Sequence, residues 1–322
     1  MSKENIIEVN NLSKTFNLEA GFFAKNKHNV YAVNDVSFSI KRGSTYGLAG
    51  ESGCGKTTTA RLLIQLYKQT SGNIKFYDSD PSLPQEVDAY KKNQLRLYRE
   101  KVKYIFQDPA RSLNPRLTVY KVLTTGLKYS SLWQGKDAAR QLAEKIITEV
   151  GLSPEDLDRR PAEFSGGQRQ RISIARGLIM NPSLLICDEV VSALDVSIQG
   201  QVLKLLQDLR KSRNLSYIFI THDLKVACYF CDTIGVMYRG YLVEEAPATD
   251  LYKTAMHPYT KLLFEGAQGL LNNSNQEVKT TLLQENCCPF AYRCPKATKR
   301  CKNELPDFKQ VSDSHRVRCF EV

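Results

Sequence analysis

The chain has 322 residues, of which 42% are hydrophobic, enough to bury the core of one large or two modest domains. No apolar run approaches the roughly 20 residues of a membrane-spanning helix, and the first ten residues lack the apolar stretch of a secretory signal, so we expect a cytosolic protein that reaches a membrane only through partners. The net charge of +11 comes from scattered basic residues, so we interpret it as solubilising and expect no nucleic-acid partner.

The predicted elements alternate in the manner of an α/β nucleotide-binding core. From Ser44 onward a strand, a glycine-rich loop and a helix follow one another. Amphipathic spacing predicts a helical subdomain at about residues 108–163, inserted between two core strands. Tyr238-Arg239-Gly240 predicts the turn of a hairpin, and polar residues predict a loop around 25–28. The predicted strands are Ile6–Val9, Val36–Ile40, Leu184–Cys187, Tyr217–Thr221, Ile234–Met237 and Tyr241–Glu244.

Residues 50–58 fit a phosphate-binding loop, because Gly50, four further residues and Gly55-Lys56-Thr57 stand between a predicted strand and a predicted helix. Glycines let backbone N–H groups close around phosphates, and the helix N-terminus adds partial positive charge. We expect Lys56 to reach the β- and γ-phosphates of ATP and the Thr57 hydroxyl to bind Mg²⁺. A chance match is the alternative, which this context disfavours. The predicted ATP contacts here are Gly50, Ser52, Gly53, Cys54, Gly55, Lys56, Thr57 and Thr58.

Two carboxylates end the predicted strand at residues 184–187. Asp188 is expected to hold Mg²⁺ through water, as in other P-loop NTPases, and Glu189 to polarise the attacking water. The alternative is a solvated acidic pair at the end of a strand. The upstream phosphate-binding loop favours the catalytic interpretation.

Phe164-Ser165-Gly166-Gly167-Gln168 resembles the signature motif of ATP-binding-cassette (ABC) ATPases. A serine and two glycines at the start of a helix also suit an anion-binding N-terminus, with a plain glycine-rich turn as the alternative. The resemblance implies a RecA-like core with an antiparallel β subdomain and an inserted helical subdomain. It also implies that two cassettes pack head to tail, so that the signature residues contact the γ-phosphate of the partner's ATP.

Four further residues resemble positions of the same family. Gln107 resembles the Q-loop glutamine, implied to bind ATP, to sense Mg²⁺ and water and to report to a membrane partner. His222 resembles the switch histidine, implied to contact the γ-phosphate and position Glu189. Asp195 matches the D-loop. Phe16 resembles the aromatic residue that stacks on adenine, with a core phenylalanine as the alternative.

The segments FQDPARSLNPR, CDEVVSALDVSIQGQ and HPYTKLL resemble the ATPases of oligopeptide and dipeptide importers, and are closer to the second of their two ATPase subunits. Nickel importers share these segments. The resemblance implies a heterodimer with a second ABC ATPase, two integral-membrane permease subunits, and indirectly an extracytoplasmic solute-binding protein. The chain is then expected at the cytoplasmic face of the membrane, held there by the permeases.

Five of the nine cysteines lie at the end of the chain, after a polar stretch at residues 269–278 that predicts a linker. We expect an ATPase domain at residues 1–250 and a cysteine-rich extension at 251–322. Without a secretory signal, metal ligation is favoured over disulfides. Four thiolates suit an iron–sulfur cluster or Zn²⁺. Resemblance to the importer subfamily implies a [4Fe-4S] cluster on Cys288, Cys294, Cys301 and Cys319, with Zn²⁺ or unliganded thiols as alternatives.

Two other functions compete with transport. The positive charge and the cysteine tail also suit a soluble ABC ATPase acting on nucleic acid or ribosomes, but such proteins mostly carry two cassettes or a long coiled coil, and this chain shows no internal repeat. A metal-storage or redox protein would use the cysteines alone. The complete ATP-site pattern disfavours it.

Overall fold

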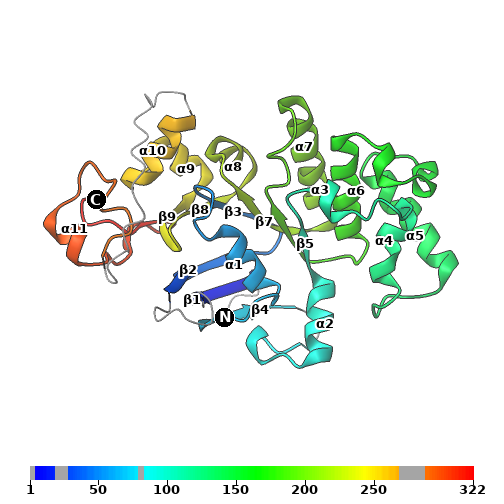
Figure 1. The fold of residues 1–322 in the computed structure, drawn as a ribbon, viewed down its shortest axis with the longest axis horizontal. Helices are drawn as coiled ribbons and strands as arrows, with labels where there is room; N and C mark the ends of the chain where they lie inside the picture. Colours follow the sequence, from blue (N-terminus) through cyan, green and yellow to red (C-terminus); the bar gives the residue numbers. More distant parts are fainter. Residues whose placement is uncertain (1–3, 19–27, 79–82, 268–286) are drawn as a thin grey trace. The chain divides into compact units, whose positions relative to one another are not determined.

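The computed structural model describes residues 4–18, 28–78, 83–267 and 287–322 (Figure 1). These residues group into two units. The described residues of the helical unit fall within 1–7, 39–44 and 75–220, and those of the P-loop unit fall within 8–38, 45–74 and 221–322. The predicted loop before His28 and the predicted linker at 269–278 lie outside the described residues. None of the helices in the described ranges is both long and apolar enough to cross a bilayer.

The P-loop unit contains a mixed sheet in which the order of strands is β10-β11-β9-β8-β3. A parallel pair joins β3 to β8, and antiparallel pairs join β8 to β9, β9 to β11 and β11 to β10. The bounds are β3 (Thr45–Ala49), β8 (Thr233–Tyr238), β9 (Tyr241–Pro247), β10 (Lys309–Ser312) and β11 (His315–Val317). The hairpin predicted around Tyr238-Arg239-Gly240 is confirmed, and the cysteine-rich tail adds two strands to the sheet that carries the P-loop.

Further elements complete this unit. A three-stranded sheet runs in the order β2-β1-β4, and most of its length belongs to the P-loop unit. Its strands are β1 (Asn5–Leu18), β2 (His28–Lys41) and β4 (Ser71–Phe76). The helices are α1 (Lys56–Leu63), α8 (Leu224–Phe230), α9 (Ala248–Thr254), α10 (Pro258–Ala267) and α11 (Lys299–Asn303).

Three parallel strands form the sheet of the helical unit, in the order β5-β6-β7. They are β5 (Val102–Ile105), β6 (Leu184–Asp188) and β7 (Ser216–Thr221). Every residue of β6 and β7 is buried, which explains why these segments are nearly continuous apolar runs. Around them lie α2 (Lys92–Lys101), α6 (Gly166–Leu178), α7 (Val196–Arg213) and the 3-10 turn η1 (Val87–Ala89). The strands predicted at residues 184–187 and 217–221 are confirmed as β6 and β7.

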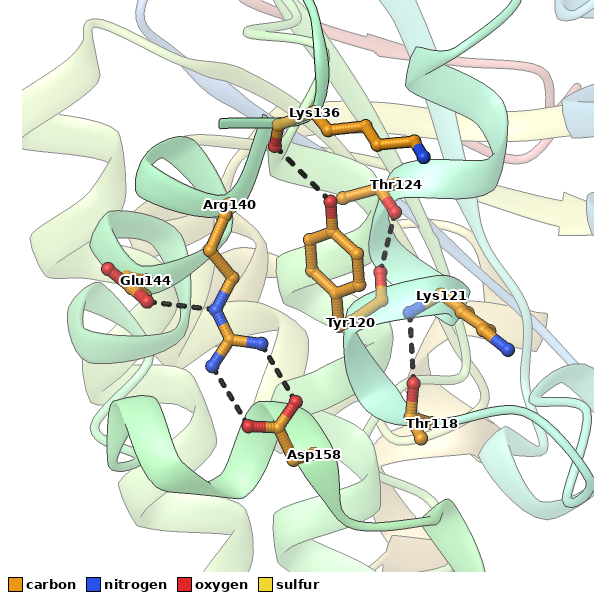
Figure 2. A network of polar contacts seen from close by, with 8 residues as sticks. All are labelled: Thr118, Tyr120, Lys121, Thr124, Lys136, Arg140, Glu144 and Asp158. Carbon is orange, nitrogen blue, oxygen red and sulfur yellow. Dashed lines mark hydrogen bonds and ion pairs between the residues drawn. The ribbon is translucent and has the colours of Figure 1, made fainter. Parts of the chain in front are cut away.

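Residues 109–163 contain several short helices, three of which are joined by contacts of the Arg140 guanidinium (Figure 2). Arg140 donates to Glu144 on its own helix at 2.9 Å and to both carboxylate oxygens of Asp158 at 2.8 and 3.0 Å. Its guanidinium also lies 5.4 Å from the ring of Tyr120. Arg140 therefore links α4, α5 and η2. The elements are α3 (Pro109–Ser112), α4 (Val119–Leu127), α5 (Lys136–Glu149), η2 (Pro154–Asp158) and η3 (Pro161–Glu163).

Candidate functional site

The loop after β3 has a backbone that only glycine can adopt at its two key positions. Gly50 and Gly55 have φ angles of 150° and 111°. A Cβ atom at Gly50 would lie 2.2 Å from the carbonyl oxygen of Met237, and one at Gly55 would lie 2.3 Å from that of Ala32. The glycines therefore let the loop pack tightly against the backbone at Met237 and Ala32.

Lys56 is buried at the start of α1, with only 4% of its surface exposed. Its Nζ donates to the carbonyl oxygens of Gly50 at 2.7 Å and Glu51 at 2.9 Å. Gly55 is the N-cap residue of α1 and has no side chain that could cap the first N–H groups of the helix. An ammonium group and a helix N-terminus at one loop suit a phosphate group. Burial raises the pKa of the Cys54 thiol, although Lys56 opposes the shift, so this loop residue stays neutral.

The predicted carboxylates and the predicted Q-loop glutamine come together in the helical unit. Gln107 Nε2 donates to Glu189 Oε2 at 2.7 Å, and the Tyr104 hydroxyl donates to Asp188 Oδ2. Asp188 is the buried last residue of β6, and Glu189 follows it with a positive φ of 49°. A non-glycine residue in this region costs about 1–3 kcal/mol and is commonest at functional sites. The strained backbone fits the catalytic role predicted for Glu189.

The predicted signature motif forms the start of α6. Ser165 Oγ accepts from the backbone N–H of Gln168 at 3.3 Å, and Gln168 Oε1 accepts from the backbone N–H of Ser165 at 2.9 Å. A Cβ atom at Gly167 would lie 2.7 Å from Ile198, so glycine lets α7 approach. Ser165 is exposed and Gly166 half-buried, which leaves this helix N-terminus accessible.

Three further predicted residues lie on other elements of the two units. His222 is exposed directly after β7, and Asp195 is exposed at the N-cap of α7. Phe16 is half-buried on β1, where its ring meets the edge of Tyr67 at 5.4 Å and the ammonium of Lys14 at 5.0 Å. Their roles toward a nucleotide remain predictions.

Sequence reasoning missed three residues around the P-loop. Arg293 donates to both carboxylate oxygens of Glu51, at 2.9 and 3.0 Å, and the Glu51 backbone N–H donates to the Tyr259 hydroxyl at 2.8 Å. The available signal was the presence of Tyr259 and Arg293 in the HPYTKLL and Arg293-Cys294-Pro295 segments, but nothing there pointed to the P-loop. A cavity of about 310 Å³ lies at this contact, lined by Glu51, Ser52, Gly53, Cys54, Tyr238, Arg239 and Arg293.

Among the four tail cysteines predicted to bind a metal, three have pKa values raised in part by neighbouring thiols. The pKa of Cys288 is raised to about 11, mainly by burial and to a smaller extent by the other three thiols. The pKa values of Cys294 and Cys319 are also raised, first by burial and then by neighbouring thiols. Nevertheless, across the described ranges no three His, Cys, Asp or Glu side chains form a group able to hold a metal ion. Neither the predicted cluster nor the alternative of Zn²⁺ therefore gains support from a formed metal site, and both remain predictions.

Comparisons with known proteins identify the family to which this site is similar. The profile described as "ABC transporter" matches residues 33–192, and that described as "Oligopeptide/dipeptide transporter, C-terminal region" matches residues 243–301. Oligopeptide transport ATP-binding protein AppF of Bacillus subtilis is 39% identical, with 99% of this chain and 98% of AppF covered. Di/tripeptide transport ATP-binding protein DppF of Pseudomonas aeruginosa is 37% identical, with 99% and 98% covered.

Solved structures with a similar fold are also ABC transporter cassettes. The structure of cbiO1 from Clostridium perfringens, part of the ABC transporter complex cbiONQ, matches with a TM-score of 0.66 and 25% identity, covering 78% of this chain and 92% of cbiO1. The cassette MJ0796 bound to ADP and Pi matches with a TM-score of 0.63 and 26% identity, covering 75% of this chain and 98% of MJ0796.

Proposed function

The chain belongs to the ATP-binding subunits of oligopeptide and dipeptide ABC transporters, and from this premise we propose that it is the ATP-hydrolysing motor of a peptide importer. The predicted ABC-type P-loop NTPase fold is confirmed at the level of the family. The division into residues 1–250 and 251–322 remains a prediction. The observation that carries the ATPase assignment is the hydrogen bond from Gln107 to the strained Glu189, next to Asp188.

In the proposed reaction, ATP and water give ADP and phosphate. Lys56 and the backbone N–H groups of residues 50–58 bind the phosphates, and Glu189 polarises the attacking water. His222 contacts the γ-phosphate. Gln107, which already donates to Glu189, orients the carboxylate and senses the water.

The oxygen atoms of Thr57 and Asp188 are the kind of ligand that Mg²⁺ prefers, with Gln107 as a third predicted contact. Mg²⁺, when bound, neutralises charge on the phosphates. The Tyr104 hydroxyl fixes the orientation of the Asp188 carboxylate, as outer hydrogen-bond partners of metal ligands do.

We further propose that the active unit is a dimer of cassettes. The exposed N-terminus of α6 at Ser165 supports this, because a helix start with Gly166 and Gly167 suits the γ-phosphate of a partner's ATP. MJ0796 itself is described as a dimeric cassette. A second, different ATPase subunit, two permease subunits and a solute-binding protein complete the proposed importer, with this chain at the cytoplasmic face.

Recovery of the tagged chain from its host tests this function. We expect it in the membrane fraction, with two integral-membrane permease subunits and a second ABC ATPase. Recovery with RNA or ribosomes in place of permeases would contradict transport and favour the alternative suggested by the net charge of +11.

For the tail we propose that Cys288, Cys294, Cys301 and Cys319 hold a [4Fe-4S] cluster. The pKa values of Cys288, Cys294 and Cys319 are each raised in part by neighbouring thiols of this set, Cys301 among them. Four cysteine thiolates are a ligand set that an iron–sulfur cluster takes, and the same set would suit Zn²⁺ as the alternative. When bound, the cluster would supply positive charge that offsets the crowding of the thiolates.

Anaerobic purification tests the cluster. We expect iron, acid-labile sulfide and broad visible absorption in the wild type, and their loss in Cys288→Ser, because that variant removes one of four ligands. The matched control is Cys228→Ser on α8, a half-buried cysteine outside the tail, which should keep the iron. An iron-free wild type prepared in this way would overturn the proposal.

A further inference from the structure

We infer that the C-terminal region braces the phosphate-binding loop through Glu51, with Arg293 and Tyr259 as positioning residues for ATP binding. The inference rests on the proposed ATPase function and deepens it. It gives the C-terminal region a task at the ATP site that does not depend on any metal.

Glu51 is held at three points. Its carboxylate accepts two hydrogen bonds from Arg293, its backbone N–H donates to the Tyr259 hydroxyl, and its carbonyl accepts from Lys56 at 2.9 Å. A fork of two parallel N–H···O bonds fixes the plane of a carboxylate as well as its distance. The peptide before Glu51 and the Glu51 carboxylate are therefore fixed by residues from far along the chain, whereas the peptide after Glu51 is held by Lys56 of the P-loop itself.

The brace itself rests on packed aromatic rings. Tyr259 is fully buried, with its ring centre 4.5 Å from that of Tyr238 and 5.4 Å from that of Phe290. The Arg293 guanidinium lies 5.8 Å from both the Tyr238 and Phe290 rings. Side chains locked in this way can position another residue because they have few other rotamers.

The tail stays attached to the sheet without Arg293. Glu244 of β9 is fully buried, and it accepts from the backbone N–H groups of Met256 and His257 and bonds to His315 at 2.9 Å. Arg316 pairs with Glu245 at 2.8 Å. Removing Arg293 should therefore release the P-loop without unfolding the tail.

The expected effect is on affinity for ATP. With the brace in place, the Glu51 peptide stays in the orientation in which Lys56 sits over the loop. Without the brace, the loop spends part of its time in other conformations. The apparent affinity for ATP then falls in proportion to the fraction of molecules whose loop is in the binding-competent conformation. At saturating ATP the loop is filled, so kcat should change little while KM rises.

Binding of a fluorescent ATP analogue with Mg²⁺ to the full-length chain tests the brace. Because the ion pair is half-exposed, we expect Arg293→Ala to weaken binding by about fivefold. Arg293→Lys keeps the charge without the fork and should recover only part of the loss. Tyr259→Phe removes one hydroxyl and should weaken binding in the same direction. The same variants in the assembled transporter should raise KM for ATP more than they lower kcat.

Two controls separate positioning from general damage. Arg300→Ala changes an arginine of the same tail that pairs with Glu304 and stacks on Phe320, and its binding should equal that of the wild type. In the double variant Glu51→Gln/Arg293→Ala, the second change should add no further loss, because both act on one contact.

Unchanged affinity and KM in Arg293→Ala and Arg293→Lys, or additive losses in the double variant, would overturn the brace. Should Arg293→Ala melt early, Arg293→Lys and Glu51→Gln decide the question. A wild-type chain that fails to bind Mg-ATP would overturn the proposed function together with the brace, whereas wild-type binding with unaltered variants would overturn the brace alone.

Discussion

Replacing Glu189 by glutamine is expected to lower ATP turnover in the assembled transporter by about 10²–10⁴, the usual contribution of a general base. Glutamine keeps the size of the side chain and one oxygen that can accept from Gln107, whose Nε2 lies 2.7 Å from Glu189 Oε2. It cannot take up a proton from the attacking water. Mg-ATP binding, measured with a fluorescent analogue, should persist while phosphate release nearly stops.

The matched control is Glu86→Gln, which changes an exposed glutamate of the same unit that has no predicted role. Its turnover should equal that of the wild type. Turnover within a few-fold of wild type in Glu189→Gln would contradict the assignment of the base. Loss of ATP binding in that variant would instead mean that Glu189 acts in binding the nucleotide.

Acidification from pH 6.5 to pH 4 should cost the P-loop unit about 3 kcal/mol of stability through His257 alone. Burial lowers the pKa of this histidine from 6.5 to about 4, and its Nδ1 accepts from the backbone N–H of Tyr259 at 3.1 Å. The unfolded chain takes up the proton near pH 6.5, but the folded chain only near pH 4. Between these values the unfolded state binds more protons, so the stability present above pH 6.5 is lost as the pH falls. Urea unfolding at pH 7 and at pH 4 measures the loss.

His257→Asn is the control, because an asparagine oxygen can accept the same backbone hydrogen but does not titrate in this range. All other titratable side chains are common to both proteins, so the difference between the two pH profiles isolates His257. An identical acid loss in both would show that His257 does not stay neutral in the folded state.

The parts of the fold that were predicted are those encoded over short distances. Buried strands such as β6 are nearly unbroken apolar runs. The P-loop is a contiguous motif, and its glycines are required because a Cβ atom at Gly50 or Gly55 would clash with neighbouring backbone. The tail strand β10 was missed because all four of its residues are exposed and carry no alternating pattern. Residues 315–317 form a strand because they pair with β9, which the local sequence does not reveal.

The residues of the candidate site also fall into those that the sequence indicated and those whose partners lie far away in the sequence. Gln107 was found only because the sequence resembles a family, since an isolated glutamine carries no chemical signal of its own. Tyr104 was missed because its partner, Asp188, lies 84 positions away. The contact between Glu51 and Arg293 joins residues 242 positions apart, and a carboxylate in one motif does not indicate which distant arginine it will meet.

The pairing of β11 with β9 also has a consequence for biosynthesis. Ribosomes make β3 and the P-loop early, but residues 315–317 emerge much later. Until then β9 has an open edge, and Glu244 lacks its histidine partner. The nascent P-loop unit therefore has an exposed strand edge, prone to aggregation, from the time β9 is made until the tail follows it. If Arg293 positions Glu51 as inferred, the nucleotide loop takes its final form only after the tail has joined this unit. Chaperones that shield open strand edges would act during this interval.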